Sequence, residues 1–427
     1  MKKNKRGNRK SELIVVTTCF LALVIILIVF AFWRTPERGS HFTKSNEWVR
    51  GVIPRMDIEL NQVSLDEIKA GSKDVRYGNN ELTIIDGSDE DEYGNIEIKG
   101  RGNTGWFNGK RSFQIKFPNK IDLFGMGKGK KWVLLPNYID ATSLRNDIAF
   151  LMAKMVGERF ADRGKFVEVS FNGEYEGLYY VMHKVEISKE SVDVRNESGV
   201  LFELDDLHGS EEEHYESYFG EKLVLKDMLM KKSEQKEQII KSFLTDYNEF
   251  EKALEKEDYS TVSRIIDIDS FVEYYLINEF TVNPDAYLSS FYLYRNDEGK
   301  ICAGPVWDFD YALGNREWIW QEDDGFFSPI EKGKNLQSKM MKLLIKTPVF
   351  QKRLSEIFEE RLQGKKDYLL STIIYKAHQI DNAVTKNNKK WNKNDFRLEL
   401  KNLLEWVERR YDYFETEYGK DIEEWLN

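Results

Sequence analysis

One stretch of the chain decides the expected fold: residues 278–310, NEFTVNPDAYLSSFYLYRNDEGKICAGPVWDFD. An apolar helix with Asp269 as its N-cap is predicted to lead into it. A loop with Asp285 follows, and then the aromatic strand 291–294, an Asn-Asp-Glu-Gly turn and a return strand. The return strand ends near Asp308. Because a hairpin brings the chain back to where it started, the two aspartates are expected to lie close together although 23 positions separate them.

A glycine-rich loop, GRGNTG at 100–105, is the second informative segment. It lies between an alternating strand at 95–99 and another at 112–117. Such loops let backbone N–H groups approach phosphate oxygens. A dinucleotide-binding fold would need a helix directly after the loop, whereas strand, glycine loop and strand is the order found in kinase-type nucleotide folds. An ordinary glycine-rich hairpin turn is the alternative interpretation.

The strand after this loop carries a lysine that could serve the same chemistry. Period-two alternation places Phe113, Ile115 and Phe117 on one face of the strand, so Lys116 points away from the apolar layer. An ammonium group there could meet nucleotide phosphates, although a solvated strand lysine is the alternative. A glycine loop, a strand lysine and then two aspartates around a hairpin form the order in which a kinase assembles its site.

Five further motifs are KGRGNTGW at 99–106, KWVLLPN at 131–137, LRND at 144–147, NGEYEGLY at 172–179 and GPVWDFD at 304–310. Together these segments resemble the CotH family, the spore coat protein H type of atypical protein kinases. The resemblance covers roughly residue 56 to the C-terminus, with the motifs in consistent order. It implies a secretory-kinase-like enzyme that transfers the ATP γ-phosphate to Ser or Thr of protein substrates, including itself. We therefore expect an α+β, atypical protein-kinase-like two-lobed fold with a helical C-terminal region, preceded by one N-terminal transmembrane helix.

The resemblance also implies roles for individual residues. Asp285 matches the catalytic-loop aspartate and Asp308 the metal-binding aspartate, with structural caps as the alternative for both. Ser290 stands where a conventional kinase has a second metal-binding Asn, which leaves that ligand open, and Asp310 is the substitute candidate. ATP and Mg²⁺ (or Mn²⁺) are the implied cofactors. The expected site residues are Asp285 for catalysis, Gly100, Gly102, Asn103, Gly105 and Lys116 for ATP, and Asp308, Asp310 and Ser290 for the metal.

Two assignments stay open within this interpretation. Lys110 and Arg111 compete with Lys116 for the phosphate contact, and Asp147 and Glu158 are the candidates for the acidic partner of the lysine. Two other functions also stay open: transfer of AMP by a kinase-like fold, and a non-catalytic surface module that binds a partner. Mass shifts of a modified substrate would separate phosphate from AMP, and nucleotide binding would argue against the module.

The N-terminal segments predict a membrane anchor. Residues 1–12 hold six basic residues and one acidic residue, and the 21 residues at 13–33 carry no charge. At about 1.5 Å per residue this run is long enough to cross a hydrocarbon core of roughly 30 Å. A cleaved signal peptide is the alternative, but its apolar core is usually shorter, about 7–15 residues. We therefore expect a single-pass membrane protein, held in the lipid bilayer through 13–33, with a cytoplasmic N-terminus and an extracytoplasmic globular part.

Composition limits the remaining possibilities. The chain has 63 basic and 73 acidic residues, which gives a net charge of −10 and argues against nucleic-acid binding. Its two cysteines cannot build a disulfide scaffold. A helix with Ser143 as N-cap and Gly157 as its end is predicted within the strand-rich part. The expected organisation is a basic tail at 1–12, the span at 13–33, a linker at 34–55 and a CotH-like domain at 56–427, itself divided into a strand-rich part at 56–204, a charged, solvated helical insertion at 205–258, a catalytic part at 259–330 and a helical part at 331–427.

Overall fold

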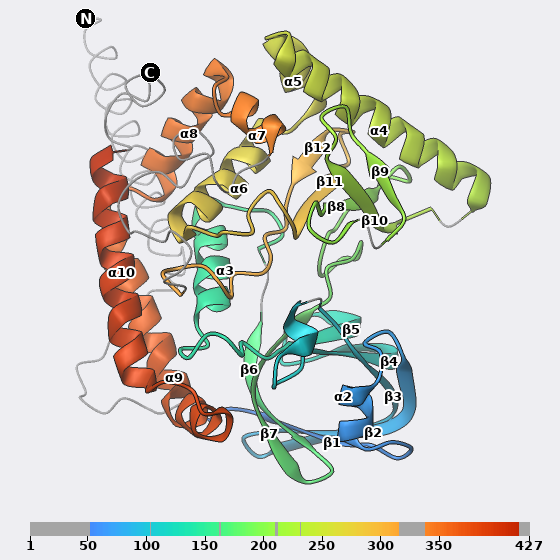
Figure 1. The fold of residues 1–427 in the computed structure, drawn as a ribbon, viewed down its shortest axis with the longest axis vertical. Coiled ribbons are helices and arrows are strands. Elements are labelled where there is room, and N and C mark those ends of the chain that lie inside the picture. Colours follow the sequence, from blue (N-terminus) through green and yellow to red (C-terminus); the bar gives the residue numbers. More distant parts are fainter. Residues whose placement is uncertain are drawn as a thin grey trace, which may run out of the picture. The chain divides into compact units, whose positions relative to one another are not determined.

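The computed structural model describes residues 52–102, 104–161, 164–209, 212–230, 232–315 and 338–417. Seven strands close into a barrel in the order β1-β2-β3-β4-β5-β7-β6 (Figure 1). Strand β1 closes it, because it pairs antiparallel with β2 and parallel with β6. The strands are β1 (Arg55–Glu59), β2 (Arg76–Asp86), β3 (Asp89–Gly100), β4 (Phe113–Asp122), β5 (Lys128–Leu135), β6 (Lys165–Phe171) and β7 (Glu174–His183), and the short helix α2 (Leu65–Ala70) connects β1 to β2.

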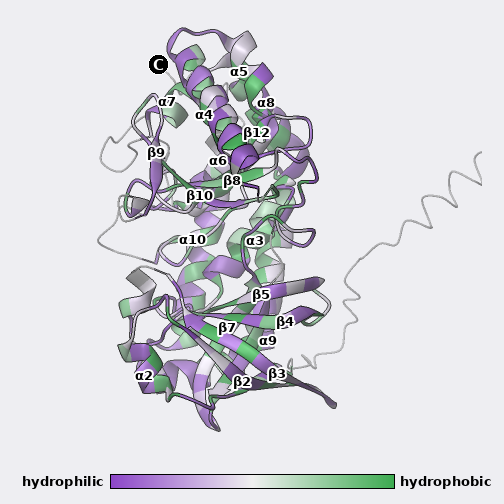
Figure 2. Ribbon diagram, turned by 90° about the vertical axis from the view of Figure 1, so that its right-hand side faces the viewer, coloured by the Kyte–Doolittle hydropathy of each residue, from purple (hydrophilic) through white to green (hydrophobic). Residues whose placement is uncertain are grey.

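Alternation along the strands explains the barrel. Phe113, Ile115 and Phe117 of β4 are buried in its apolar interior, as predicted, and Figure 2 shows hydrophobic and hydrophilic residues following one another along the barrel strands. An Asn-Gly pair between two apolar runs, as at 172–173, predicts a hairpin, and β6 and β7 form it. Its Asn172 and Gly173 have φ values of 49° and 77°, the left-handed conformation that a two-residue hairpin turn requires.

A second sheet of five strands has the order β12-β11-β8-β10-β9. The predicted hairpin of the deciding stretch is confirmed, since β11 pairs antiparallel with β12. Residues 205–258 differ from the expected helical insertion: two of the sheet's strands precede a helix there. The apolar side chains of Leu223, Val224 and Met228 are buried. This apolar segment is short and has charged neighbours, so its sequence pattern does not predict a strand. The strands are β8 (Val200–Leu204), β9 (His214–Glu216), β10 (Lys222–Met228), β11 (Phe291–Arg295) and β12 (Ile301–Ala303).

Helices account for most of the remaining described residues, and α6 packs against α3, α8 and α10. The described residues of the predicted helical part, from 338 onward, are indeed largely helical. The helices are α3 (Arg145–Val156), α4 (Ser233–Glu255), α5 (Tyr259–Ile265), α6 (Ile268–Thr281), α7 (Lys339–Leu344), α8 (Pro348–Arg361), α9 (Lys366–Trp391) and α10 (Phe396–Glu417), with a 3₁₀ turn at Thr104–Phe107.

Two predicted N-caps are wrong, and the predicted helix end is right. Helix α3 ends at Gly157, whose φ is 91°. Its first turn is capped by Asp140, whose carboxylate accepts a hydrogen bond from the Arg145 N–H at 2.9 Å, while Ser143 makes no cap. Helix α6 is capped by Asp267, two residues before the predicted Asp269. A cap is chosen by local backbone geometry, which a one-dimensional pattern locates only within a few residues.

The expected fold class is confirmed in its coarser form. The described chain is a mixed α/β structure, but its first part closes into a barrel, so the two-lobed kinase fold is not what the strands form. Within the described ranges no helix is long and apolar enough to cross a membrane. The predicted span 13–33 and tail 1–12 lie outside those ranges. We therefore withdraw the prediction of a single-pass membrane protein with an extracytoplasmic domain.

Candidate active site

The hairpin brings Asp285 and Asp308 together, as the sequence predicts. The loop after α6 is held by its own hydrogen bonds: the Asp285 carbonyl accepts from the N–H groups of Leu288 and Ser289, both at 3.1 Å. Burial raises the pKa of Asp285 to about 6, and the negative charge of Asp308 is the next cause. The two carboxylates are therefore close enough to repel each other.

Asp308 combines two properties of a reactive group. Its side chain is exposed to solvent, yet its pKa is raised chiefly by burial, while the positive charge of Arg101 acts in the opposite direction. Solvent thus reaches a carboxylate that lies deep among protein atoms.

Backbone strain is concentrated around these two aspartates. Non-glycine residues with φ between 49° and 64° occur at Val282, Tyr287, Ser290, Asp308 and Leu313. Each left-handed residue of this kind costs free energy, of order 1–3 kcal/mol, and such residues cluster at functional sites. The strain supports a functional interpretation of the loop and of the Asp308 segment. The role of Ser290 as a metal ligand stays a prediction.

Helix α3 holds the Asp308 segment in place through the LRND motif. The Asn146 side chain accepts a hydrogen bond from the Phe309 N–H at 2.9 Å and donates one to the Asp310 carboxylate. The guanidinium of Arg145 donates to the carbonyl of Ala312 at 3.1 Å. Burial raises the pKa of Asp310 to about 8, with Asp308 as the next cause. The motif therefore fixes Asp310 beside Asp308.

The KWVLLPN motif supports the same arrangement. The Asn137 carboxamide accepts from Asn146 at 3.1 Å and donates to the Ser143 carbonyl at 3.0 Å. Asp140 forms an ion pair with Arg145 at 2.5 Å, and both side chains are almost fully buried. Three of the motifs behind the family resemblance thus meet at one place.

Arg101, a residue that the sequence analysis did not single out, faces this acidic group from the glycine loop. Its backbone N–H donates to the Ser112 carbonyl at 3.1 Å, and its guanidinium carbon lies 4.9 Å from the centroid of the Trp307 ring. Burial lowers the pKa of Arg101, while acidic groups including Asp308 and Asp310 oppose that effect. The only signal in the sequence was its position between the first two glycines of the loop.

The other glycine-loop predictions have mixed outcomes. A Cβ atom on Gly100 would overlap the Trp106 ring at 2.4 Å, and Gly102 has a φ of 81°, so close packing favours glycine at the first position and backbone conformation favours it at the second. Gly105 has open space around it. Asn103 lies outside the described residues. Contacts of these residues with ATP stay predictions.

Lys116 points away from the barrel interior, as predicted, but the structure does not bring it to the aspartates. Its ammonium nitrogen forms an ion pair with Glu97 on the neighbouring strand at 2.9 Å. Ser112, which holds Arg101, lies four residues earlier on the same segment, roughly 13 Å away at about 3.3 Å per residue. A phosphate contact by Lys116 stays a prediction.

The two competitors of Lys116 differ from each other. Lys110 is fully buried, and its ammonium donates to the carbonyls of Pro136 and Leu178 and to the Asn387 carboxamide, which joins the barrel to α9. It is a structural residue. The Arg111 guanidinium lies over the Trp106 ring at 5.3 Å. Its Nε and Nη1 atoms are buried and have no hydrogen-bond partner among the described residues.

Neither predicted acidic partner contacts Lys116. Asp147 accepts hydrogen bonds from the Tyr180 hydroxyl at 3.0 Å and the Lys376 ammonium at 2.7 Å. Glu158 accepts one from the Phe160 N–H at 3.0 Å. Glu97 takes that place instead, and as a cross-strand neighbour it could have been found by pairing the strands on either side of the glycine loop.

The donor set fits a nucleotide with a divalent cation. The described ranges contain no group of three or more His, Cys, Asp or Glu side chains arranged around a metal position. Mg²⁺ in phosphoryl-transfer sites takes one or two protein carboxylates and completes its shell with water and substrate phosphates. Asp308 and Asp310 supply two carboxylates that repel each other, and a cation between them would relieve that repulsion. The unpartnered Arg111 N–H groups are suited to an anion.

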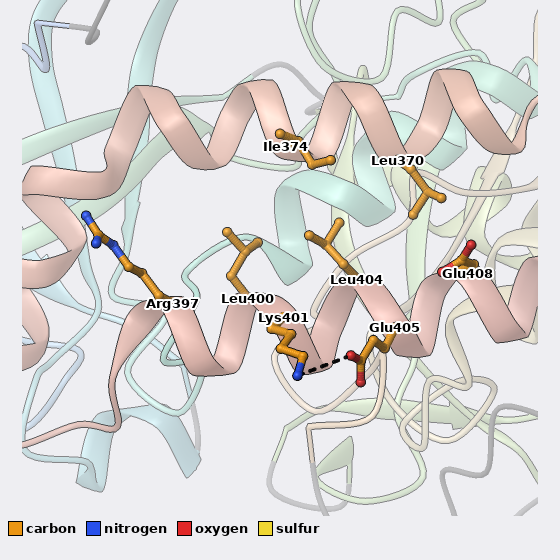
Figure 3. Close-up of a pocket in the computed structure, with 8 residues that line it drawn as sticks. All are labelled: Leu370, Ile374, Arg397, Leu400, Lys401, Leu404, Glu405 and Glu408. Carbon is orange, nitrogen blue, oxygen red and sulfur yellow. Dashed lines mark ion pairs between the residues drawn. The ribbon is translucent and has the colours of Figure 1, made fainter. Parts of the chain in front are cut away.

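A hollow of the surface lies between α9 and α10 (Figure 3). It contains none of the predicted site residues. Apolar side chains, among them Leu370 and Leu404, line it, and an ion pair between Lys401 and Glu405 at 3.6 Å lies along α10. The acidic group around Asp308 therefore remains the candidate active site.

The fold and the site define a class: a mixed α/β protein with a seven-stranded barrel, in which acidic side chains face an arginine of the glycine loop. Comparison with protein families matches residues 96–414 to the family described as CotH kinase protein. That range includes every motif quoted above and covers well over half of the chain, so this chain belongs to the CotH family. A search of curated proteins finds no match.

Proposed function

We propose that this CotH-family member is a protein kinase that transfers the γ-phosphate of ATP to Ser or Thr hydroxyls of protein substrates, including itself. The observation that carries the proposal is that Asp308 interacts electrostatically both with Asp285 and with Arg101 of the glycine loop. Phosphoryl transfer depends mainly on positioning and on stabilising negative charge. This arrangement offers a base, a metal-binding carboxylate and a cation.

Each side chain has a distinct part in the proposed reaction. Asp285, with its pKa raised to about 6, is ionised at neutral pH and basic enough to accept the proton of the substrate hydroxyl or to orient that hydroxyl. Asp308 and Asp310 would hold Mg²⁺ or Mn²⁺, which supplies positive charge against the transferred phosphate. The glycine loop presents backbone N–H groups to the phosphates. Asn146 keeps Asp310 in place through its hydrogen bond.

Incubation of the purified full chain with γ-labelled ATP and Mg²⁺ or Mn²⁺ tests the proposal. Label should enter the chain itself or a Ser-containing acceptor protein. Asp285→Asn should lower the rate by about 10²- to 10⁴-fold, because a positioned base contributes that much, and Asp308→Asn should abolish incorporation. Asp91→Asn is the matched control, since Asp91 is exposed on β3. Circular dichroism should show all three variants folded.

The same reaction distinguishes the alternatives. Undiminished incorporation by both Asp285→Asn and Asp308→Asn would contradict the assignment. Mass spectrometry of the product separates phosphate from AMP. A chain whose melting temperature does not respond to Mg-ATP would instead be a non-catalytic binding module.

A further inference from the structure

Arg101 has no assigned role, yet its environment is unusual for a guanidinium. It is half-buried, and within the described ranges its guanidinium has neither a hydrogen bond nor an ion pair within 4.0 Å. The guanidinium carbon lies over the face of Trp307, 4.9 Å from the ring centroid. Stacking of this kind fixes the plane of the guanidinium and leaves its N–H edge free. Trp307 directly precedes Asp308, so the stack holds Arg101 beside that carboxylate.

Acidic groups around Arg101 attract its guanidinium electrostatically, but none of the described ones forms an ion pair with it. Burial lowers its pKa, and the groups that oppose this include Tyr292, Asp308 and Glu203. Glu203 is already paired with Lys226 at 2.6 Å. The guanidinium thus lies beyond ion-pair distance of the acidic group it faces. An oxygen-rich anion that carries its own cation could bind both sides at once, with its oxygens on Arg101 and its cation on the carboxylates.

The barrel face next to Arg101 carries a second donor without a partner. Gln114 lies two positions after Ser112, whose carbonyl binds the Arg101 N–H. Gln114 is only 4% exposed, and its Nε2 atom is buried without a hydrogen-bond partner among the described residues. Its pairing partner Val133 belongs to the apolar core of the C-terminal part, so this face of the barrel looks toward that part. A buried amide donor without a hydrogen-bond partner costs free energy, and a ligand that accepts a hydrogen bond from it removes that cost.

We propose that Arg101 is the residue that binds the nucleotide phosphates and positions them next to Asp308, in the place expected for Lys116. This inference rests on the proposed function. A guanidinium suits the task because its planar N–H groups bind two phosphate oxygens at once. The neighbouring Gln114 donates to the same ligand. Lys116 keeps a purely structural ion pair with Glu97.

Calorimetric titration of the purified full chain with Mg-ATP and, separately, with adenosine tests the inference without measuring catalysis. Arg101→Met should weaken ATP binding about tenfold to a hundredfold, the range expected for losing a charged hydrogen bond, and should leave adenosine binding unchanged. Arg101→Lys should fall between wild type and Arg101→Met, and free guanidine should restore part of the ATP affinity of Arg101→Met. Arg195→Met is the control, because the Arg195 side chain is 77% exposed.

The outcomes separate the two levels of the argument. A wild-type chain that binds no ATP overturns both this inference and the proposed function. Unchanged ATP binding by Arg101→Met overturns the inference alone, and so does an equal loss of ATP and adenosine binding, which would indicate a structural role. If Arg101→Met does not fold, Arg101→Lys decides: weaker ATP binding with unchanged adenosine binding supports the inference, and unchanged ATP binding overturns it.

Discussion

The barrel and the helical part behind the candidate site bury their side chains in opposite ways. The barrel interior is a cluster of apolar residues such as Ile98 and Trp132. Behind the site, by contrast, two ion pairs are almost completely buried: Arg410 with Glu279 at 3.0 Å, and Arg145 with Asp140 at 2.5 Å. Both contact the site segments, because Arg410 also donates to the Phe280 carbonyl near the end of α6, before the Asp285 loop.

The difference shows where the structure needs one exact geometry. An apolar core tolerates changes that conserve volume. A buried ion pair adds little net stability, because desolvation offsets its attraction, but removing one partner leaves an uncompensated charge. The barrel is therefore a scaffold that can vary. The buried pairs specify how α3 and α10 hold the two aspartate segments.

The largest effect that this comparison predicts is on unfolding. Arg410→Met should lower the free energy of unfolding by about 3–5 kcal/mol, because it removes the guanidinium that pairs with the buried Glu279 carboxylate. Ile98→Val in the barrel should cost only about 0.5–1.5 kcal/mol. Arg397→Met on α10 is the matched control, since the Arg397 side chain is 77% exposed and its pair with Asp381 should be worth about 1 kcal/mol or less. Urea unfolding measures all three.

Equal destabilisation by Arg410→Met and Ile98→Val would contradict the proposed difference between the apolar barrel core and the buried ion pairs. It would mean that the helical part relaxes around the lost charge as easily as the barrel relaxes around a lost methyl group.

A second, smaller effect concerns pH and a pair of buried carboxylates, Glu251 on α4 and Glu221 just before β10. Glu251 on α4 accepts hydrogen bonds from Ser217 at 2.9 Å and Phe219 at 3.0 Å, and Glu221 accepts them from Tyr247 and Ser338, both at 2.8 Å. Burial raises the pKa of Glu251 to about 8, and the charge of Glu221 is the next cause. The two carboxyl groups thus favour a protonated state that an exposed Glu would not.

The sign of the effect follows from this raised pKa. Between about pH 4.5 and 8 the folded chain binds more protons than the unfolded chain, so the contribution of Glu251 is complete below pH 4.5 and is lost as the pH rises through 8. Because of this site, the free energy of unfolding should be about 2–4 kcal/mol higher at pH 5 than at pH 9. Glu251→Gln should remove that difference, while Glu237→Gln, exposed on the same helix, should leave it. An unchanged pH profile in Glu251→Gln would contradict the assignment.

Local patterns predicted much of the fold. Period-two alternation located β4, an Asn-Gly pair located the hairpin at 172–173, and Gly157 marked the end of α3. The proximity of Asp285 and Asp308 also followed, because a hairpin is a local structure that returns the chain to its start. These features depend on residues close together in sequence.

Long-range pairing and side-chain competition could not be predicted in this way. Closure of the barrel depends on β1 pairing with β6, more than 100 residues away. Lys110 and Arg101 have the same charge and flank the same loop, and only the folded chain shows that one is buried on carbonyl groups while the other faces Asp308. Charge alone does not determine which cation of a loop is structural.

The smallest predicted effect tests whether Lys116 is a structural cation or a phosphate-binding one. Lys116 and Glu97 are each about one third exposed, so their ion pair should contribute about 1 kcal/mol or less. Lys116→Met should therefore change the free energy of unfolding by no more than that. It should also change the affinity for Mg-ATP by less than about twofold, well below the effect of a lost charged hydrogen bond. The measurement is urea unfolding together with the titration used for Arg101→Met. A loss of ATP affinity as large as that of Arg101→Met would return Lys116 to the site and would mean that the glycine-loop strand contributes two phosphate-binding cations.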